Sequence, residues 1–207
     1  MHKKDLHTAG KDLKKAKKVL ILLHGRGATA KNILDLESHL PLNDFAMIAP
    51  QATNQTWYPY SFLAPINENE PWLSSALELL RDILEDLLGK GFHSRDIYLL
   101  GFSQGACLCL EFAARNARRY GGIAAFTGGL IGETLDPENY SGDFEATPVF
   151  IGTGDPDTHV PVGRVKRSAE ILNNMNADVS LKIYENRPHT ISENELELAR
   201  DIIFYQN

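Results

Sequence analysis

The sequence predicts an α/β fold, in which one domain is built on a mainly parallel, doubly wound sheet. Short apolar runs alternate along the chain with amphipathic stretches of helical period, and this alternation is typical of parallel strands joined by crossover helices. The chain has 207 residues, of which 43% are hydrophobic, so it is long enough to fill one large core. We therefore expect residues 1–207 to form a single domain, with residues 1–18 as a solvated leader before the first core strand.

The expected strands are nearly continuous in apolar residues. Strands covered by helices on both faces of a sheet should have this composition. In chain order the expected strands are Val19–Leu23, Phe45–Ala49, Asp96–Leu100, Gly122–Thr127, Pro148–Gly152 and Ser180–Tyr184.

The expected helices lie between these runs and after the last of them. The clearest is Leu73–Leu88, because its leucine and isoleucine side chains recur with helical period and form one apolar stripe. The others are Ala30–His39, Gln104–Asn116, Val162–Met175 and Glu193–Phe204.

A long aromatic loop, Pro50 to Pro71, shows no periodicity. Such a loop inside a compact domain is usually either functional or disordered, and its large apolar side chains disfavour disorder. We expect it to form a wall of the substrate site. The expected pocket residues in this region are Trp57, Tyr58, Phe62 and the adjoining Trp72.

Charge and cysteine usage exclude several classes of function. The net charge is −6, which argues against a surface that binds nucleic acid.

Cys107 and Cys109 are two residues apart on an expected helix, so they point to different faces and cannot pair with each other. They are interpreted as small buried residues in a reducing cytoplasm. No apolar run approaches the ~20 residues of a membrane span. We expect a cytoplasmic protein without stable membrane insertion.

The most specific motif is Gly101-Phe102-Ser103-Gln104-Gly105, which lies between an apolar run and an expected helix. In α/β-hydrolases a G-x-S-x-G sequence in this setting forms the nucleophile elbow, a turn so tight that the serine takes a strained backbone conformation. Glycines at positions 101 and 105 supply the clearance that this turn requires. Ser103 is therefore the candidate nucleophile.

A serine nucleophile needs an imidazole to take its proton and a carboxylate to orient that imidazole. In this fold the chain order is serine, acid, histidine. The loop after the Pro148–Gly152 run holds two candidate acids, Asp155 and Asp157. We favour Asp157, with Asp155 shaping the turn. His189 follows the last expected strand and is the candidate base, whereas its rival His159 precedes that strand.

Two backbone N–H groups are expected to form an oxyanion hole. One donor should be the residue after the nucleophile, Gln104. The other should come from the loop that leaves the first core strand, where His24-Gly25-Arg26-Gly27 lets the backbone approach a ligand. Arg26 is the candidate second donor. Its side chain is expected either to attract an anionic substrate group or to pair with an acidic residue.

Taken in this order, the motifs resemble the phospholipase/carboxylesterase family of small α/β-hydrolases, which includes the acyl-protein thioesterases and has no large lid domain. The similarity extends from about Val19 to Tyr205. The resemblance implies Ser103 as nucleophile, Asp157 as acid and His189 as base, with oxyanion amides from Arg26 and Gln104. The matching stretches are Leu22–Gly27, Ala49–Ala52, Gly101–Gly105, Asp157–Pro161 and Tyr184-Glu185 leading to His189.

The chain departs from the family pattern at two places. The family usually has an aliphatic residue and then Gly-Asp-Thr-Gly after His-Gly, whereas here the run is Arg26-Gly27-Ala28-Thr29-Ala30. The aromatic loop around Trp57 and Trp72 also differs from the thioesterase pattern. Both differences disfavour long-chain lipid and acyl-protein substrates.

The expected reaction is that of a serine carboxylesterase acting on small or aromatic esters, without a cofactor or metal. One alternative is an acyl-protein thioesterase or lysophospholipase, which would use the same residues. Another is a non-catalytic binding protein with a hydrolase fold. The resemblance also suggests a homodimer.

Overall fold

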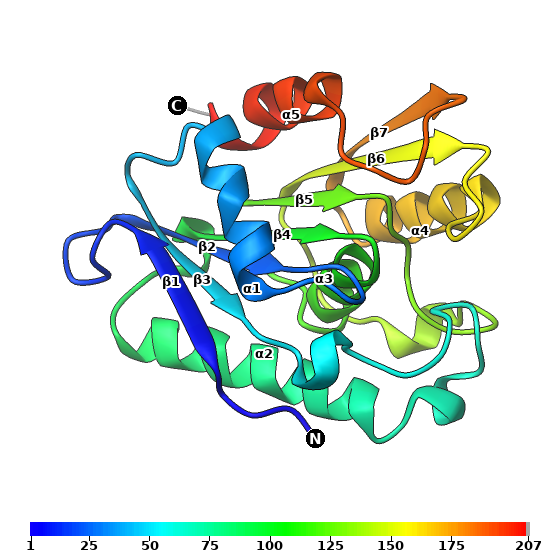
Figure 1. Cartoon of the computed structure of the whole chain (residues 1–207), viewed down its shortest axis with the longest axis horizontal. Coiled ribbons are helices and arrows are strands. Elements are labelled where there is room, and N and C mark those ends of the chain that lie inside the picture. Colours follow the sequence, from blue (N-terminus) through cyan, green and yellow to red (C-terminus); the bar gives the residue numbers. More distant parts are fainter. Residues whose placement is uncertain (206–207) are drawn as a thin grey trace.

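A sheet of seven strands runs through the part of the molecule that the structure describes, residues 1–205, and helices cover both of its faces (Figure 1). The structure is a computed structural model. The strands are β1 Leu6–Gly10, β2 Lys18–Leu23, β3 Phe45–Pro50, β4 Ile97–Phe102, β5 Gly122–Phe126, β6 Pro148–Asp155 and β7 Asp178–Glu185. The helices are α1 Ala30–Leu34, α2 Trp72–Gly89, α3 Gln104–Arg115, α4 Val162–Asn174 and α5 Glu193–Ala199.

The order of the strands in the sheet is β1-β3-β2-β4-β5-β6-β7. β1 runs antiparallel to β3, and the other neighbouring strands pair in parallel. In the central strand β4, Leu99 pairs with Ile21 on one side and with Ile123 on the other. The predicted α/β class with a mainly parallel, doubly wound sheet is confirmed. In such sheets ligands bind beyond the carboxyl ends of the strands.

Successive strand residues contribute to separate cores on the two faces of the sheet. Along β2, Ile21 and Leu23 pack in the core that also holds side chains of α2, α3 and α4. Leu20 and Leu22 pack in the core that holds side chains of α1 and α5. Both faces are therefore buried, which explains the nearly continuous apolar runs of the sequence.

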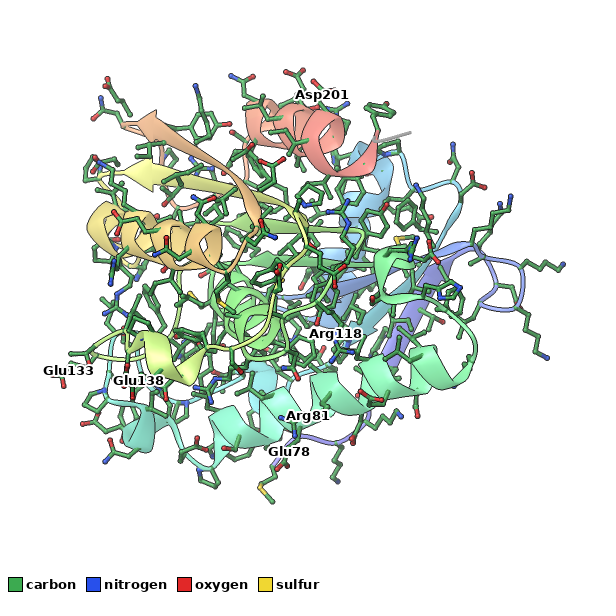
Figure 2. All side chains as sticks on the ribbon, turned by 180° about the vertical axis from the view of Figure 1, so that it is seen from behind. Glu78, Arg81, Arg118, Glu133, Glu138 and Asp201 are labelled. Carbon is green, nitrogen blue, oxygen red and sulfur yellow. The ribbon has the colours of Figure 1, made fainter. Side chains whose placement is uncertain are left out.

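The helix α2 shows the amphipathic character that its sequence predicts. Its leucine and isoleucine stripe is buried, whereas Glu78 and Arg81 are exposed on its outer side (Figure 2). None of the helices within residues 1–205 is long and apolar enough to cross a membrane.

The prediction of a solvated leader over residues 1–18 is wrong for Leu6–Gly10. These residues form β1, which pairs with β3 from Ala46 to Pro50. The segment Leu-His-Thr-Ala-Gly is too short and polar to predict a strand by itself, and the open edge of β3 supplies the hydrogen-bonding partners. The predicted domain also includes residues 206 and 207, which lie outside the described residues.

Some element boundaries also differ from the prediction. The expected helix Ala30–His39 leaves α-helical geometry after Leu34 and ends in a tighter turn, η1 Asp35–His39. The last expected helix divides into α5 and a wider turn, η6 Arg200–Phe204. β6 runs on to Asp155, because it pairs with β7 as far as Glu185.

Candidate active site

Ser103 lies at the junction of β4 and α3, with φ of 54° and ψ of −118°. This is a positive φ that residues with a Cβ rarely adopt. The turn is held by the Ser103 N–H, which donates to the Phe126 carbonyl at 2.9 Å. A Cβ on Gly105 would lie 2.2 Å from the Leu23 carbonyl oxygen, and one on Gly101 would lie 2.3 Å from the Gly105 oxygen. The turn therefore has the steric requirements of a nucleophile elbow.

Two loops at the carboxyl ends of β6 and β7 bring an acid and a histidine to this serine. His189 Nε2 lies 2.8 Å from Ser103 Oγ, and His189 Nδ1 lies 2.8 Å from Asp157 Oδ2. The Asp157 side chain is fully buried, and its Oδ1 accepts hydrogen bonds from the N–H groups of His159 and Val160 at 2.8 and 2.9 Å. The structure thus joins Asp157, His189 and Ser103 in one chain of hydrogen bonds.

The Asp157 carboxyl is held in its ionised form. Burial raises its pKa, but hydrogen bonds from His189 and from two backbone N–H groups outweigh that effect and leave the pKa below its ordinary value. A carboxylate at this position can orient the imidazole and stabilise the imidazolium that forms when the ring takes a proton.

Asp155 and His159, the alternative candidates for the acid and the base, lie outside the hydrogen-bonded chain of side chains. Asp155 ends β6 and is exposed, away from the hydrogen-bonded chain. The His159 ring meets the His189 ring edge-on, with 5.0 Å between centroids, and its own N–H supports Asp157. Of the two candidate acids, Asp157 is the one that contacts the histidine.

Arg187 on the histidine loop and Glu195 of α5 are partners that no motif in the sequence points to. Their side chains form a buried ion pair. Arg187 also donates to the Thr190 carbonyl at 2.6 Å and to Thr127 Oγ1 at 3.0 Å. The capping box formed by Ser192 and Glu195 is visible in the sequence as S-x-x-E, but it marks only the start of α5 and not the partner of Glu195.

The two expected oxyanion donors lie beside Ser103. Gln104 is the first residue of α3, so its N–H has no acceptor within the helix. Arg26 lies on the loop after β2, and Gly25 lets this loop approach the elbow, since a Cβ there would meet the Phe102 ring at 3.2 Å. Both donors and Ser103 border the same pocket.

This pocket has a volume of about 340 Å³. Tyr58 and Phe62 line it, as expected for the aromatic loop. The expectation is wrong for the two tryptophans. Trp57 is fully buried behind the loop and donates from Nε1 to the His24 carbonyl at 2.8 Å. Trp72 packs edge-on against His2, with ring centroids 5.4 Å apart.

Comparison with known proteins identifies the family. The model of the family described as Phospholipase/Carboxylesterase matches residues 8–207. The chain belongs to the phospholipase/carboxylesterase family. A crystal structure of a phospholipase/carboxylesterase from Dyadobacter fermentans is 53% identical, with a TM-score of 0.96 over 98% of this chain and 97% of that chain.

Two relatives with lower sequence identity support the same family assignment. Acyl-protein thioesterase 1 of Kluyveromyces lactis is 28% identical over 206 residues, which cover 88% of this chain and 89% of that protein. The crystal structure of esterase PE8 is 26% identical, with a TM-score of 0.78 over 95% of this chain and 96% of that chain. The expected family and its α/β-hydrolase fold are confirmed. The protein is a hydrolase of the carboxylesterase and acyl-protein thioesterase family.

The Arg26 side chain pairs with no acidic residue in residues 1–205. The expected ion pair is therefore wrong. The guanidinium donates instead to the carbonyls of Tyr58, Pro59 and Tyr60, at 2.9, 2.9 and 2.7 Å. It ties the loop after β2 to the aromatic loop.

The cysteines are unsuited to serve as nucleophiles. Both are free and fully buried. Burial raises the pKa of Cys107 to about 12, and it raises the pKa of Cys109 as well. A thiol in this state carries almost no thiolate at neutral pH, so Ser103 is the better candidate in this family member.

Proposed function

We propose that this phospholipase/carboxylesterase family member is a serine carboxylesterase that hydrolyses small or aromatic carboxylic esters. The observation that carries the proposal is the hydrogen-bonded chain from Asp157 through His189 to Ser103 Oγ, with both links at 2.8 Å. A nucleophile within hydrogen-bond reach of a base, and a base oriented by a carboxylate, make the arrangement that acyl transfer requires.

In the first half of the reaction, Ser103 Oγ attacks the ester carbonyl carbon while His189 Nε2 takes its proton. The tetrahedral oxyanion accepts hydrogen bonds from the N–H groups of Gln104 and Arg26, and each such donor typically contributes about 3 kcal/mol in serine hydrolases. Asp157 stabilises the imidazolium through Nδ1. His189 then gives the proton to the leaving alcohol, and the acyl group stays on Ser103.

In the second half, water repeats the attack on the acyl-enzyme. His189 takes a proton from water as its oxygen bonds to the acyl carbon, and the same two amides stabilise the second oxyanion. The Ser103 oxygen leaves and recovers its proton from His189. The carboxylic acid is released, and the enzyme returns to its starting state.

The preference for small or aromatic esters is supported by the pocket. A volume of about 340 Å³ is near the lower end for ligand pockets. Tyr58, Tyr60, Phe62 and Val160 are among its lining residues, so it offers an apolar site for a short acyl chain or an aromatic ring. Preference for a palmitoyl ester over a butyryl ester would contradict this substrate assignment.

A thioesterase or lysophospholipase is the second candidate, supported by the similarity to acyl-protein thioesterase 1 of Kluyveromyces lactis. The same residues would cleave a thioester by the same steps. The two candidates separate when kcat/KM is compared for an oxygen ester, a thioester and a lysophospholipid that carry the same acyl group. Our proposal expects the oxygen ester to be turned over fastest.

The catalytic proposal is tested with Ser103→Ala. The wild-type protein should hydrolyse p-nitrophenyl butyrate and be labelled by a fluorophosphonate probe, and the variant should lose both properties. Full turnover by the variant would overturn the proposal.

We also propose a cytoplasmic location, supported by the two free, buried thiols.

A further inference from the structure

The pocket wall formed by residues 56–62, here called the aromatic wall, has neither helix nor strand. Its backbone groups are bonded by side chains from elsewhere. On the inner side, Gln104 Oε1 accepts from the Trp57 N–H at 3.0 Å, and Gln104 Nε2 donates to the Tyr58 carbonyl at 2.8 Å. Asn69 accepts from the Tyr60 N–H and donates to the Ser61 carbonyl, each at 2.9 Å. Both amides are buried, so they fix the back of the wall.

Arg26 holds the solvent side of the aromatic wall. Its Nη1 and Nη2 groups donate to the consecutive carbonyls of Tyr58, Pro59 and Tyr60. A planar guanidinium can reach three carbonyls at once, whereas a lysine ammonium is a compact point charge on a flexible stem. The donors are charged, which strengthens the bonds relative to neutral ones.

Two of the residues whose side chains bond the aromatic wall also supply the proposed oxyanion amides. Arg26 and Gln104 each direct a side chain to the wall and border the pocket beside Ser103. Arg26 and Gln104 therefore connect the aromatic wall to the proposed oxyanion hole. An acyl group bound at Ser103 would have to fit between the hole and the rings of Tyr58, Tyr60 and Phe62.

We propose that the Arg26 guanidinium is a specificity-determining positioning residue that keeps the aromatic wall closed over the acyl pocket and so restricts the enzyme to short and aryl acyl groups. This inference rests on the proposed esterase function. Without the guanidinium, the carbonyls at 58, 59 and 60 lose their shared partner, and the wall can move outward to admit longer chains.

The test compares wild type with Arg26→Met, which keeps the backbone N–H and much of the side-chain length. For each protein, kcat/KM is measured for p-nitrophenyl butyrate and p-nitrophenyl octanoate in one preparation, so that the ratio is independent of the active fraction. We expect the octanoate-to-butyrate ratio to rise about tenfold, a change typical of altered fit in an apolar pocket. The change should arise mainly from a lower KM for the octanoate.

Arg26→Lys separates the hydrogen bonds from the charge. A lysine keeps the positive charge but cannot span three carbonyls, so its ratio should lie close to that of Arg26→Met. Restoration of wild-type selectivity by Arg26→Lys would overturn the proposal in favour of simple charge attraction, and so would an unchanged ratio in Arg26→Met.

Arg119→Met is the matched control. The Arg119 guanidinium donates to the carbonyls of Glu145 and Ala146, away from the pocket lining, so the ratio should stay at the wild-type value. A rise equal to that of Arg26→Met would overturn the proposal.

Fluorophosphonate labelling distinguishes failure of the esterase function from failure of the role proposed for Arg26. A wild-type protein that is neither labelled nor active contradicts the esterase function, whereas normal labelling with unchanged selectivity contradicts only the role of Arg26.

Discussion

Arg187, on the loop that carries His189, forms an ion pair with Glu195 of α5, and their side chains are 8% and 0% exposed. Arg187 also donates to the carbonyl of Thr190, the residue after His189. The pair therefore joins the start of α5 to the loop after β7 that carries His189.

Replacing Arg187 by methionine should therefore destabilise the fold and lower activity. Removal of one partner from a buried ion pair costs about 3–5 kcal/mol in the free energy of unfolding, because the other charge stays buried without a counterion. The exposed pair of Arg167 and Glu170 is the control, since Arg167→Met should cost less than about 1 kcal/mol. Urea denaturation of both variants measures the difference. Equal losses would contradict a special role for the buried pair.

Asp157→Ala should lower kcat for p-nitrophenyl butyrate by a factor of about 10³ to 10⁴, since the imidazole would lose its orienting carboxylate. Asp155→Ala is the matched control, because Asp155 is the exposed last residue of β6, two residues before Asp157, whereas the carboxylate bonded to His189 is that of Asp157. The kinetics of the two variants should therefore differ sharply. A comparable loss in both would refute the assignment of the acid.

Gly105→Ala should disrupt the elbow, because its Cβ would lie 2.2 Å from the Leu23 carbonyl oxygen. Overpacking against backbone typically costs about 1–3 kcal/mol, and here it would also displace the adjacent Gln104 amide. Gly163→Ala in α4 meets nothing within 4 Å and should be neutral or stabilising by up to about 1 kcal/mol. Thermal melting and esterase assays of the two variants test this contrast.

Two histidines, the buried His24 and the partly buried His2, predict that the fold is sensitive to acid. His24 Nε2 accepts from the Ala52 N–H at 3.1 Å, and His2 Nδ1 accepts from the Thr53 N–H at 3.1 Å. Each ring must therefore be neutral, with its other nitrogen donating to a carbonyl, that of Gly25 for His24 and that of Trp57 for His2. Burial lowers the pKa of both rings, and the bonds to these carbonyls offset this only in part.

In the unfolded chain these histidines take up protons near pH 6.5, whereas in the folded protein they do so only at lower pH. Between those values the unfolded state binds more protons, so the free energy of unfolding should fall as the pH decreases from about 6.5. Melting temperatures between pH 8 and 5 measure this effect. His24→Gln should reduce the dependence and the exposed His93→Gln should not. A stability that stays constant over this range would contradict the prediction.

Local sequence patterns were sufficient to predict most of the strands and the position of the elbow. The apolar run before Ser103, the glycines around it and the helical period after it are consequences of short-range sterics and of burial on both faces of the sheet. Chain order then selected His189 over His159, because the fold determines which loop follows the last strand. These features depend on neighbouring residues or on strand order, both of which can be read from a sequence.

The partners of particular side chains could not be read from local patterns, because they depend on how distant segments pack together. Nothing local distinguishes Trp57, whose buried side chain is not part of the pocket lining, from Tyr58, which lines the pocket. Likewise, the contacts of Arg26 with the wall and of Arg187 with Thr127 join segments that are far apart in the chain. The class of fold and the position of the candidate nucleophile could be read from the chain alone, since both follow from periodicity and backbone sterics. The pocket and its supports arose only when distant loops met at the carboxyl edge of the sheet.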